Sequence, residues 1–300
     1  MSTAPVIAAV DGSDDSLRAL DWAVAAARRR GTSLRVVHVR QYAAWGQPDV
    51  LVAGEPDGPG DPVLDEVRDR LRTGTGEPAA EYVALEGAPT ALLPQLGADA
   101  QLLVLGSRGR GGFASLLLGS NGLAAARDAG CPVVVVPRPG REVHEELPAA
   151  PGPRVVVGVD VDSPDDATLA FAFAEAAGRD ALLQVIAAYP WPVRSWAAAG
   201  GMVPPAVDQD EVEHETRTLA EGFLAPHLKN HPDVRTQILA PPGDAAGLLV
   251  SASKDADLVV VGRHRRRPLA PARMMGSVTQ AVLLHAAAPV AVVPPTPAEE

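Results

Sequence analysis

Residues 102–121 read LLVLGSRGRGGFASLLLGSN and carry most of the structural information in the first half of the chain. Residues 102–105 are all apolar, which predicts a buried strand of a parallel sheet. Gly106 ends the run, and the glycine-rich loop after it closes at Gly119-Ser120, where an alanine-rich helix is expected. Such a loop before a helix N-terminus can bind phosphate, because glycines let the backbone approach an anion and free N–H groups point at it. The same pattern also fits a connection that binds no ligand.

The composition predicts a globular protein with an aliphatic core and an excess of acidic residues. The 300 residues are 47% hydrophobic but only 4% aromatic, so Ala, Val and Leu must build the core. The formal net charge of −11 argues against a general nucleic-acid or membrane-surface role. We see no secretory leader and no apolar run long enough to span a membrane, and a single cysteine, Cys131, excludes an internal disulfide. We therefore expect a cytoplasmic location.

The second half of the chain repeats, in the same order, the motifs of the first half. The matching features lie 149 to 157 residues apart. They are Asp11 and Asp160, LLVLG at 102–106 and LVVVG at 258–262, and Gly119-Ser120 and Gly276-Ser277. Two copies of one domain are the simplest explanation.

In each copy, short apolar runs alternate with helical segments, which predicts an α/β fold and excludes a β-sandwich or a helical bundle. We expect two tandem, doubly wound parallel sheets of five strands each. The expected strands are 5–10, 34–39, 80–85, 101–105 and 132–136, then 154–159, 181–187, 233–239, 257–261 and 289–293. The expected helices of the first copy are 14–30, 61–73, 88–97 and 119–129.

Domain boundaries follow from this repeat. We expect residues 1–139 to form the first domain, 140–153 a proline-rich linker, and 154–300 the second domain. Residues 40–60 and 188–206 are insertions after the second strand of each copy. They fit either lids over a ligand or variable surface loops.

The glycine spacing carries a resemblance to a known family. Gly106, two residues, Gly109, nine residues and then Gly119-Ser120 match G-x2-G-x9-G-S/T, the ATP-binding signature of the universal stress protein family. The chain resembles a tandem universal stress protein over nearly its full length. The resemblance implies Rossmann-like domains with strand order 3-2-1-4-5, and ATP at the carboxyl ends of strands one and four.

The resemblance also implies which residues hold ATP in the first domain. Asp11 contacts the nucleoside, and the backbone at Ala9, Val10 and Val39 lies against adenine. Two segments hold the phosphates: Gly106, Ser107, Arg108 and Gly109, and then Gly119, Ser120 and Asn121. Whether Mg²⁺ accompanies the phosphates stays open.

Asp11 also has an interpretation that needs no ligand. Its carboxylate can accept a hydrogen bond from a ribose hydroxyl, but it can equally cap the helix that follows. Ser13 and Ser16 are the better caps, so we favour the ligand role for Asp11.

The second copy departs from the phosphate-binding pattern. Asp160 and Gly262 are kept, but Arg265 replaces the second glycine, and Pro268 and Pro271 remove backbone donors. The basic run from 263 to 267 fits an acidic-ligand site or, as we prefer, a solvated loop. We therefore expect ATP in the first domain only.

The fifth strand of each copy predicts how domains associate. Residues 133–136 and 289–293 are too apolar for an edge strand that faces water. Pairing them with each other would form an internal pseudo-dimer, and pairing with another chain would form a homodimer. The family commonly associates through this strand.

These features favour a binding protein whose conformation or partner binding changes with ATP occupancy in stress regulation. A slow ATPase or phosphotransferase in the same pocket is the enzyme alternative, and a nucleotide-independent scaffold is a third. No Lys or carboxylate pair accompanies Asp11 in the motif segments, so we expect at most weak ATP hydrolysis and no catalytic residue. The seven histidines are scattered and predict no metal site.

Overall fold

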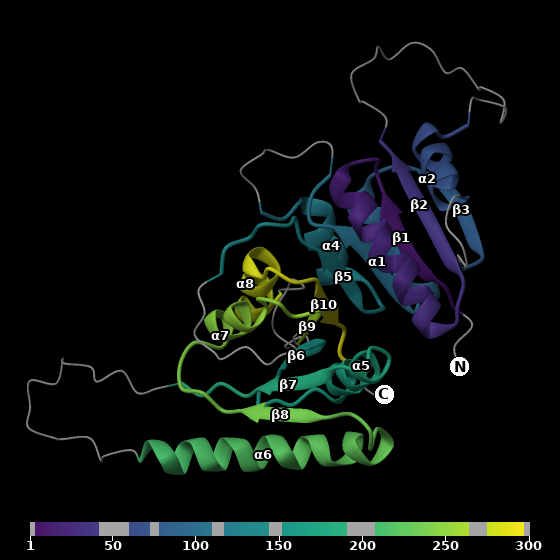
Figure 1. The fold of residues 1–300 in the computed structure, drawn as a ribbon. Helices are drawn as coiled ribbons and strands as arrows, with labels where there is room; N and C mark the ends of the chain where they lie inside the picture. The colour runs from purple at the N-terminus through teal and green to yellow at the C-terminus, as the bar shows by residue number, and fades with distance from the viewer. Residues whose placement is uncertain are drawn as a thin grey trace, which may run out of the picture. The chain divides into compact units, whose positions relative to one another are not determined.

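The computed structural model describes residues 4–41, 60–72, 78–109, 117–143, 152–190, 208–263 and 275–296 (Figure 1). These residues form two compact units. Unit 1 contains the described residues up to Pro139, and unit 2 contains those from Gly140 onward. The expected insertions at 40–60 and 188–206 fall largely outside the described residues.

Unit 1 is a parallel sheet in the order β3-β2-β1-β4-β5. The ion pair between Arg70 and Asp21, at 2.8 Å, joins α2 to α1 on one face, and α3 packs with α4. The elements are β1 (Val6–Val10), α1 (Asp14–Arg30), β2 (Leu34–Arg40), α2 (Pro62–Arg72), β3 (Ala80–Glu86), α3 (Pro89–Leu96), the 3-10 turn η1 (Gly97–Asp99), β4 (Leu102–Gly106), α4 (Ser120–Asp128) and β5 (Val133–Val136).

Unit 2 repeats this arrangement in the order β8-β7-β6-β9-β10, so each unit has the predicted 3-2-1-4-5 order. The α/β fold predicted from sequence is thereby confirmed. The elements are β6 (Arg154–Gly158), α5 (Asp166–Ala177), β7 (Leu182–Ile186), α6 (Gln209–Asn230), β8 (Thr236–Leu239), α7 (Ala245–Ala252), β9 (Leu258–Gly262), α8 (Ser277–His285) and β10 (Val290–Val293).

The strand β8 is three residues shorter than predicted, whereas most other strand ends differ from the prediction by a single residue. The prediction began it at residue 233, but β8 begins at Thr236. The N–H of Val234 donates to the carbonyl of His231 at 3.2 Å, so the preceding residues form the turn that ends α6. A backbone donor used in a turn is lost to the sheet ladder.

Local sequence explains why α1 forms and where it stops. Ser13 caps the N-terminus by accepting the N–H of Ser16 at 3.3 Å, and acidic residues occupy the first turn. Three arginines occupy the last turn, where positive charge favours the helix dipole. Gly31 ends the helix with φ of 60°, a left-handed conformation that glycine adopts readily.

The core is aliphatic, as the composition predicts. In unit 1, Val6, Ile7 and residues 102–104 are fully buried, as are their counterparts in unit 2, residues 155–157 and 258–260. Buried strands flanked by helices require such continuous apolar runs. Among the described residues, no helix combines the length and apolar character needed to cross a membrane.

Candidate nucleotide-binding site

A cavity of about 710 Å³ lies in unit 1, at the carboxyl ends of β1, β2 and β4 and the N-terminus of α4. All eleven residues predicted from the sequence motifs line it. They are Ala9, Val10, Asp11, Val39, Gly106, Ser107, Arg108, Gly109, Gly119, Ser120 and Asn121. The fold thus brings the separate motif segments together around one space, at the edge where ligands of parallel α/β sheets bind.

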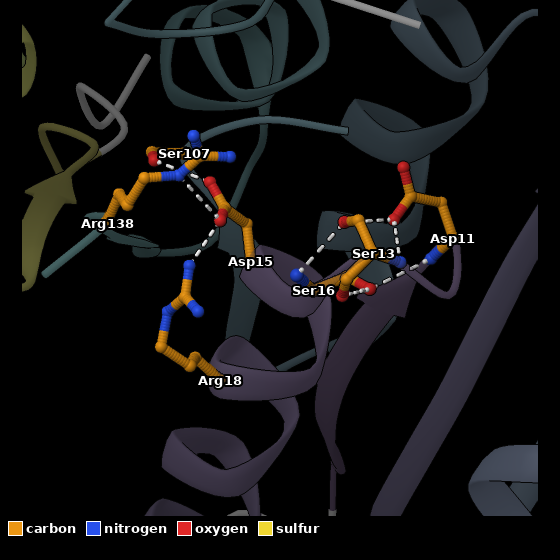
Figure 2. Close-up of polar contacts among 7 residues, drawn as sticks. All are labelled: Asp11, Ser13, Asp15, Ser16, Arg18, Ser107 and Arg138. Atoms are coloured by element: carbon orange, nitrogen blue, oxygen red, sulfur yellow. Dashed lines mark hydrogen bonds and ion pairs between the residues drawn. The ribbon is translucent and has the colours of Figure 1, made fainter. Parts of the chain in front are cut away.

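Asp11 follows directly on β1 and braces the start of α1 (Figure 2). Its Oδ1 accepts the N–H of Ser13 at 3.0 Å and the hydroxyl of Ser13 at 2.6 Å. Its own N–H donates to Oγ of Ser16 at 3.3 Å. Ser13, and not Asp11, is therefore the N-cap, as predicted. These bonds hold the Asp11 carboxylate at the cavity wall.

Two of the motif glycines are required by close approach. A Cβ at Gly109 would overlap Oδ2 of Asp11, so the loop passes directly against that carboxylate. A Cβ at Gly106 would lie 2.6 Å from backbone atoms of Asp15, where β4 ends against the first turn of α1. A side chain at Gly106 would push the end of β4 away from the helix, whereas one at Gly109 would displace the Asp11 carboxylate.

The two halves of the glycine motif are joined by backbone. The N–H of Gly119 donates to the carbonyl of Ser107 at 2.8 Å, and the N–H of Ser107 donates to Val136 at 2.9 Å. Gly119 is the N-cap of α4 and supplies no side-chain cap. The first-turn donors of α4 therefore lack a side-chain acceptor at its cap, and a helix N-terminus carries about half a positive charge. This arrangement suits an anion.

A buried carboxylate beside the loop escaped the sequence analysis. Asp15 has a side chain only 2% exposed, and its Oδ1 lies 3.2 Å from Nε of Arg138 (Figure 2). Arg18 pairs with the same oxygen, and Ser107, which lines the cavity, lies with its Oγ 3.3 Å from Oδ2. In the sequence, Asp15 is explained by its place in the first turn of a helix, where a negative charge favours the helix dipole. Only the fold reveals its contact with the loop.

His38 lines the cavity, and the motifs did not identify it. Its Nδ1 lies 2.7 Å from Oδ2 of Asp61, and Oδ1 of Asp61 accepts the N–H groups of Val63 and Leu64 at the start of α2. Burial alone would raise the pKa of Asp61, but the hydrogen bonds from His38 and from these backbone groups lower it below its ordinary value. The contact ties the cavity wall to the beginning of α2.

The comparison with known proteins agrees with this duplicated architecture. The sequence pattern of the universal stress protein family matches residues 3–137 and again residues 153–294. The chain belongs to the universal stress protein family. It is a tandem member, since each unit carries one match.

Known relatives span nearly the whole length of this universal stress protein. A universal stress protein of Mycobacterium tuberculosis is 32% identical over 298 residues, which cover 96% of each chain. A second one from that organism is 31% identical over 310 residues, covering 97% of this chain and 96% of its own. A universal stress protein of Archaeoglobus fulgidus shares the fold, with a TM-score of 0.62 at 17% identity, covering 98% of this chain and 99% of its own.

Proposed function

We propose that unit 1 binds ATP and that the protein is a nucleotide-dependent regulatory module of the stress response. The observation that carries this proposal is the convergence of all eleven motif residues on one cavity of about 710 Å³. That volume lies within the range of small-molecule sites. The domain limits that we propose remain residues 1–139 for the nucleotide domain, 140–153 for the linker and 154–300 for the second domain.

The walls suggest how ATP would lie. The apolar residues Ala9, Val10 and Val39 offer a surface for adenine, and Asp11 offers an acceptor for a ribose hydroxyl. The triphosphate would occupy the space between the glycine loop and the first turn of α4. There, Arg108 and the helix N-terminus supply positive charge. Asp11 is the one carboxylate among the described wall residues, so any Mg²⁺ would depend mainly on phosphate oxygens and water.

The same walls argue for binding rather than turnover. Phosphoryl transfer needs groups that position the nucleophile and neutralise developing charge. The described lining contains no lysine, and Asp11 already accepts two hydrogen bonds from Ser13 at one oxygen. We therefore expect ATP to act as a bound ligand, and slow hydrolysis is the alternative that measured turnover would support.

We also propose that the domains associate through their fifth strands. Within the sheet of its own unit, β5 is the strand at one edge, and β10 holds the same place in unit 2. Their sequences, VVVV and VAVV, carry no charge that would deter pairing. Chemical cross-linking and the mass of the protein in solution distinguish an internal pseudo-dimer from a homodimer.

The proposal is tested by the nucleotide that leaves the purified protein on acid denaturation. A Cβ added at Gly119 would lie 3.6 Å from its nearest neighbour, the carbonyl oxygen of Ser107, so it would not clash. The larger side chain of Gly119→Val would therefore fill the space proposed for the phosphates. Gly276→Val is the matched control in unit 2. We expect one ATP per chain in the wild type and the control, and none in Gly119→Val.

Two outcomes of this experiment contradict the proposal. Two ATP molecules per chain would show that unit 2 also binds ATP. No nucleotide in any of the proteins, together with no thermal shift on adding ATP, would mean that unit 1 shares the fold but lacks the ligand. Circular dichroism of each variant establishes that it is folded.

A further inference from the structure

One side-chain cluster in unit 1 joins the glycine loop to the segment of chain that leaves the unit. Its centre is the carboxylate of Asp15, whose side chain is only 2% exposed. Oδ2 of Asp15 accepts the hydroxyl of Ser107 at 3.3 Å, and Oδ1 accepts Nε–H of Arg138 at 3.2 Å (Figure 2). Arg18 of α1 pairs with the same Oδ1. These partners are needed because an uncompensated charge in the interior is strongly unfavourable.

Ser107 connects this cluster to the cavity of unit 1, which it lines. The residue is buried, and its backbone is bonded on both sides. Its N–H donates to the carbonyl of Val136 at 2.9 Å, and its carbonyl accepts the N–H of Gly119 at 2.8 Å. Ser107 is thus bonded to the end of β5, to the N-cap of α4 and to Asp15. A ligand that fixes the loop and the N-terminus of α4 therefore also fixes the neighbour of Asp15.

These contacts close a ring through the backbone. Val136, which accepts the N–H of Ser107, is the last residue of β5. The chain continues through Pro137, whose φ is restricted by its own ring, and reaches Arg138. Arg138 then returns to Asp15, and Asp15 to Ser107. Because the ring is closed, the positions of Ser107 and Arg138 depend on each other.

Arg138 also begins the short connection to unit 2, and we call residues 138–141 the junction segment. The boundary between the two compact units falls directly after Pro139. At the other end of the segment, Nη1 of Arg141 donates to the carbonyl of Ala286 at 2.9 Å, at the C-terminus of α8. A positive charge at that end of a helix favours the helix dipole. Each end of the junction segment is therefore held by an arginine within its own unit.

Unit 2 keeps the backbone part of this ring but not its side chains. It has a cavity of about 540 Å³ at the corresponding edge of its own sheet, and the N–H of Arg263, directly after β9, donates to the carbonyl of the last residue of β10 at 2.7 Å. Ala167 stands at the position of Asp15, so the carboxylate is missing there. Pro295 stands at the position of Arg138, so the guanidinium is missing too. The ion pair thus occurs in the unit whose last strand leads into the junction segment.

Charge gives a bound nucleotide a preference for one position of Arg138. The side chain of Arg138 is 52% exposed, and ion pairs of such exposed groups are weak enough to open. When the pair is formed, the guanidinium lies behind Ser107 at the cavity, whereas an opened side chain extends into solvent. The negative phosphates proposed for this cavity attract the guanidinium more strongly in the first arrangement. A ligand shifts an equilibrium by such a difference in interaction between two states.

We propose that Asp15 and Arg138 are positioning residues of the nucleotide site, and that they couple ATP occupancy of unit 1 to the junction segment. The inference rests on the proposed function, because it takes ATP as the ligand of unit 1. ATP holds Arg138 against Asp15 and thereby orders residues 138–141. Coupling between two equilibria is reciprocal, so loss of the Arg138 guanidinium weakens ATP binding. Unit 2 receives the change where Arg141 caps α8.

The test measures ATP affinity and amide hydrogen exchange in the full chain. In calorimetric titration, Arg138→Gln should weaken ATP binding about fivefold, at the lower end of measured couplings between sites. Arg138→Lys keeps the positive charge and should retain most of the affinity. In hydrogen exchange followed by mass spectrometry, ATP should slow the exchange of residues 138–143 about threefold in the wild type, because ordering protects backbone amides. Arg138→Gln should show no such slowing.

Arg18→Gln is the matched control, because Arg18 pairs with the same oxygen of Asp15 but lies on α1 rather than on the junction segment. This variant should keep the slowing of exchange by ATP. Asp15→Asn should remove it. Adding Arg138→Gln to Asp15→Asn should cause no further loss of ATP affinity, because the two residues act through one contact. Circular dichroism of each variant establishes that it is folded.

Three results overturn the inference while ATP still binds to the wild type. Residues 138–143 could exchange at the same rate with and without ATP, Arg138→Gln could keep both the affinity and the slowing, or Arg18→Gln could lose the slowing as Arg138→Gln does. The last result would show a general effect of charge at Asp15. Failure of the proposed function looks different, because the titration would then detect no ATP binding to the wild type, and both proposals would fall.

Discussion

The two units share a scaffold and differ in the surface that faces the ligand. Both have the same strand order and a cavity at the same edge of the sheet. Among the described lining residues, unit 1 has an amide at Asn121 and one carboxylate at Asp11, whereas unit 2 has Val278 and four carboxylates. The scaffold tolerates this divergence because both units keep the aliphatic core that holds the strands.

The N-terminus of the first helix also differs between the two units. In unit 1, Ser13 caps α1, and the buried Asp15 lies two residues further on. In unit 2, Asp165 caps α5 by accepting the N–H of Thr168 at 3.2 Å, and the residue two positions on is Ala167. Unit 2 therefore has no carboxylate at the position of Asp15. The ion pairs that Asp15 forms with Arg18 and Arg138 therefore have no counterpart at that position of unit 2.

Replacing the glycine that ends β4 or β9 by alanine should give the largest difference between the units in the loss of unfolding free energy. Gly106→Ala places Cβ 2.6 Å from backbone atoms of Asp15, so we expect unfolding free energy to fall by about 3 kcal/mol. At Gly262→Ala the nearest atoms are the Thr168 hydroxyl at 2.8 Å and Oδ2 of Asp165 at 3.5 Å, both in side chains that can shift, so about 1 kcal/mol is expected. Urea denaturation followed by circular dichroism measures both. Equal losses would show that the two strand ends are packed alike.

Removal of the N-terminal cap of α2 should lower the unfolding free energy by less than Gly106→Ala does. Asp61→Ala deletes the acceptor of two backbone N–H groups and of His38, and we expect a loss of about 2 kcal/mol. Asp208→Ala removes the exposed cap of α6 in unit 2, where about 0.5 kcal/mol is expected. If the two variants were equally stable, the contact with His38 would contribute nothing.

The same carboxylate predicts a pH dependence. Because folding lowers the pKa of Asp61 below its ordinary value of 3.8, its contribution to stability is present above pH 3.8 and is lost as the pH falls through the folded pKa. Asp61→Asn keeps a capping oxygen but cannot titrate, so its stability should fall less steeply below pH 4 than that of the wild type. Parallel pH profiles of unfolding would contradict this assignment.

Loss of the strand-end aspartates should separate the units in ligand binding. Asp11→Ala removes the carboxylate at the nucleoside side, and we expect ATP affinity to fall about 30-fold, as for a lost hydrogen bond to a charged group. Asp160→Ala should leave ATP affinity unchanged. Calorimetric titration measures both, and an equal effect of the two variants would place ATP in both cavities.

Arg138→Ala should have the smallest effect on the unfolding free energy. The guanidinium is about half exposed, and Asp15 keeps its contacts with Arg18 and Ser107, so we expect a loss of about 0.5 kcal/mol or less. Arg70→Ala, which breaks an exposed ion pair with Asp21 away from the cavity, is the control for surface charge. A loss well above that of the control would show that Arg138 is needed to neutralise the buried Asp15.

The sequence by itself determined the fold class and the duplication, and its resemblance to the universal stress protein family implied the strand order and the segments that line the cavity of unit 1. Hydrophobic periodicity and glycine spacing are local properties, and parallel strands bring their carboxyl ends to one edge. Only the tertiary structure decided the partners of the polar side chains. Ser107 and Arg138 lie 92 and 123 residues from Asp15, and His38 lies 23 residues from Asp61. No periodic signal records contacts at such separations, because they depend on how helices and strands pack rather than on how each one forms.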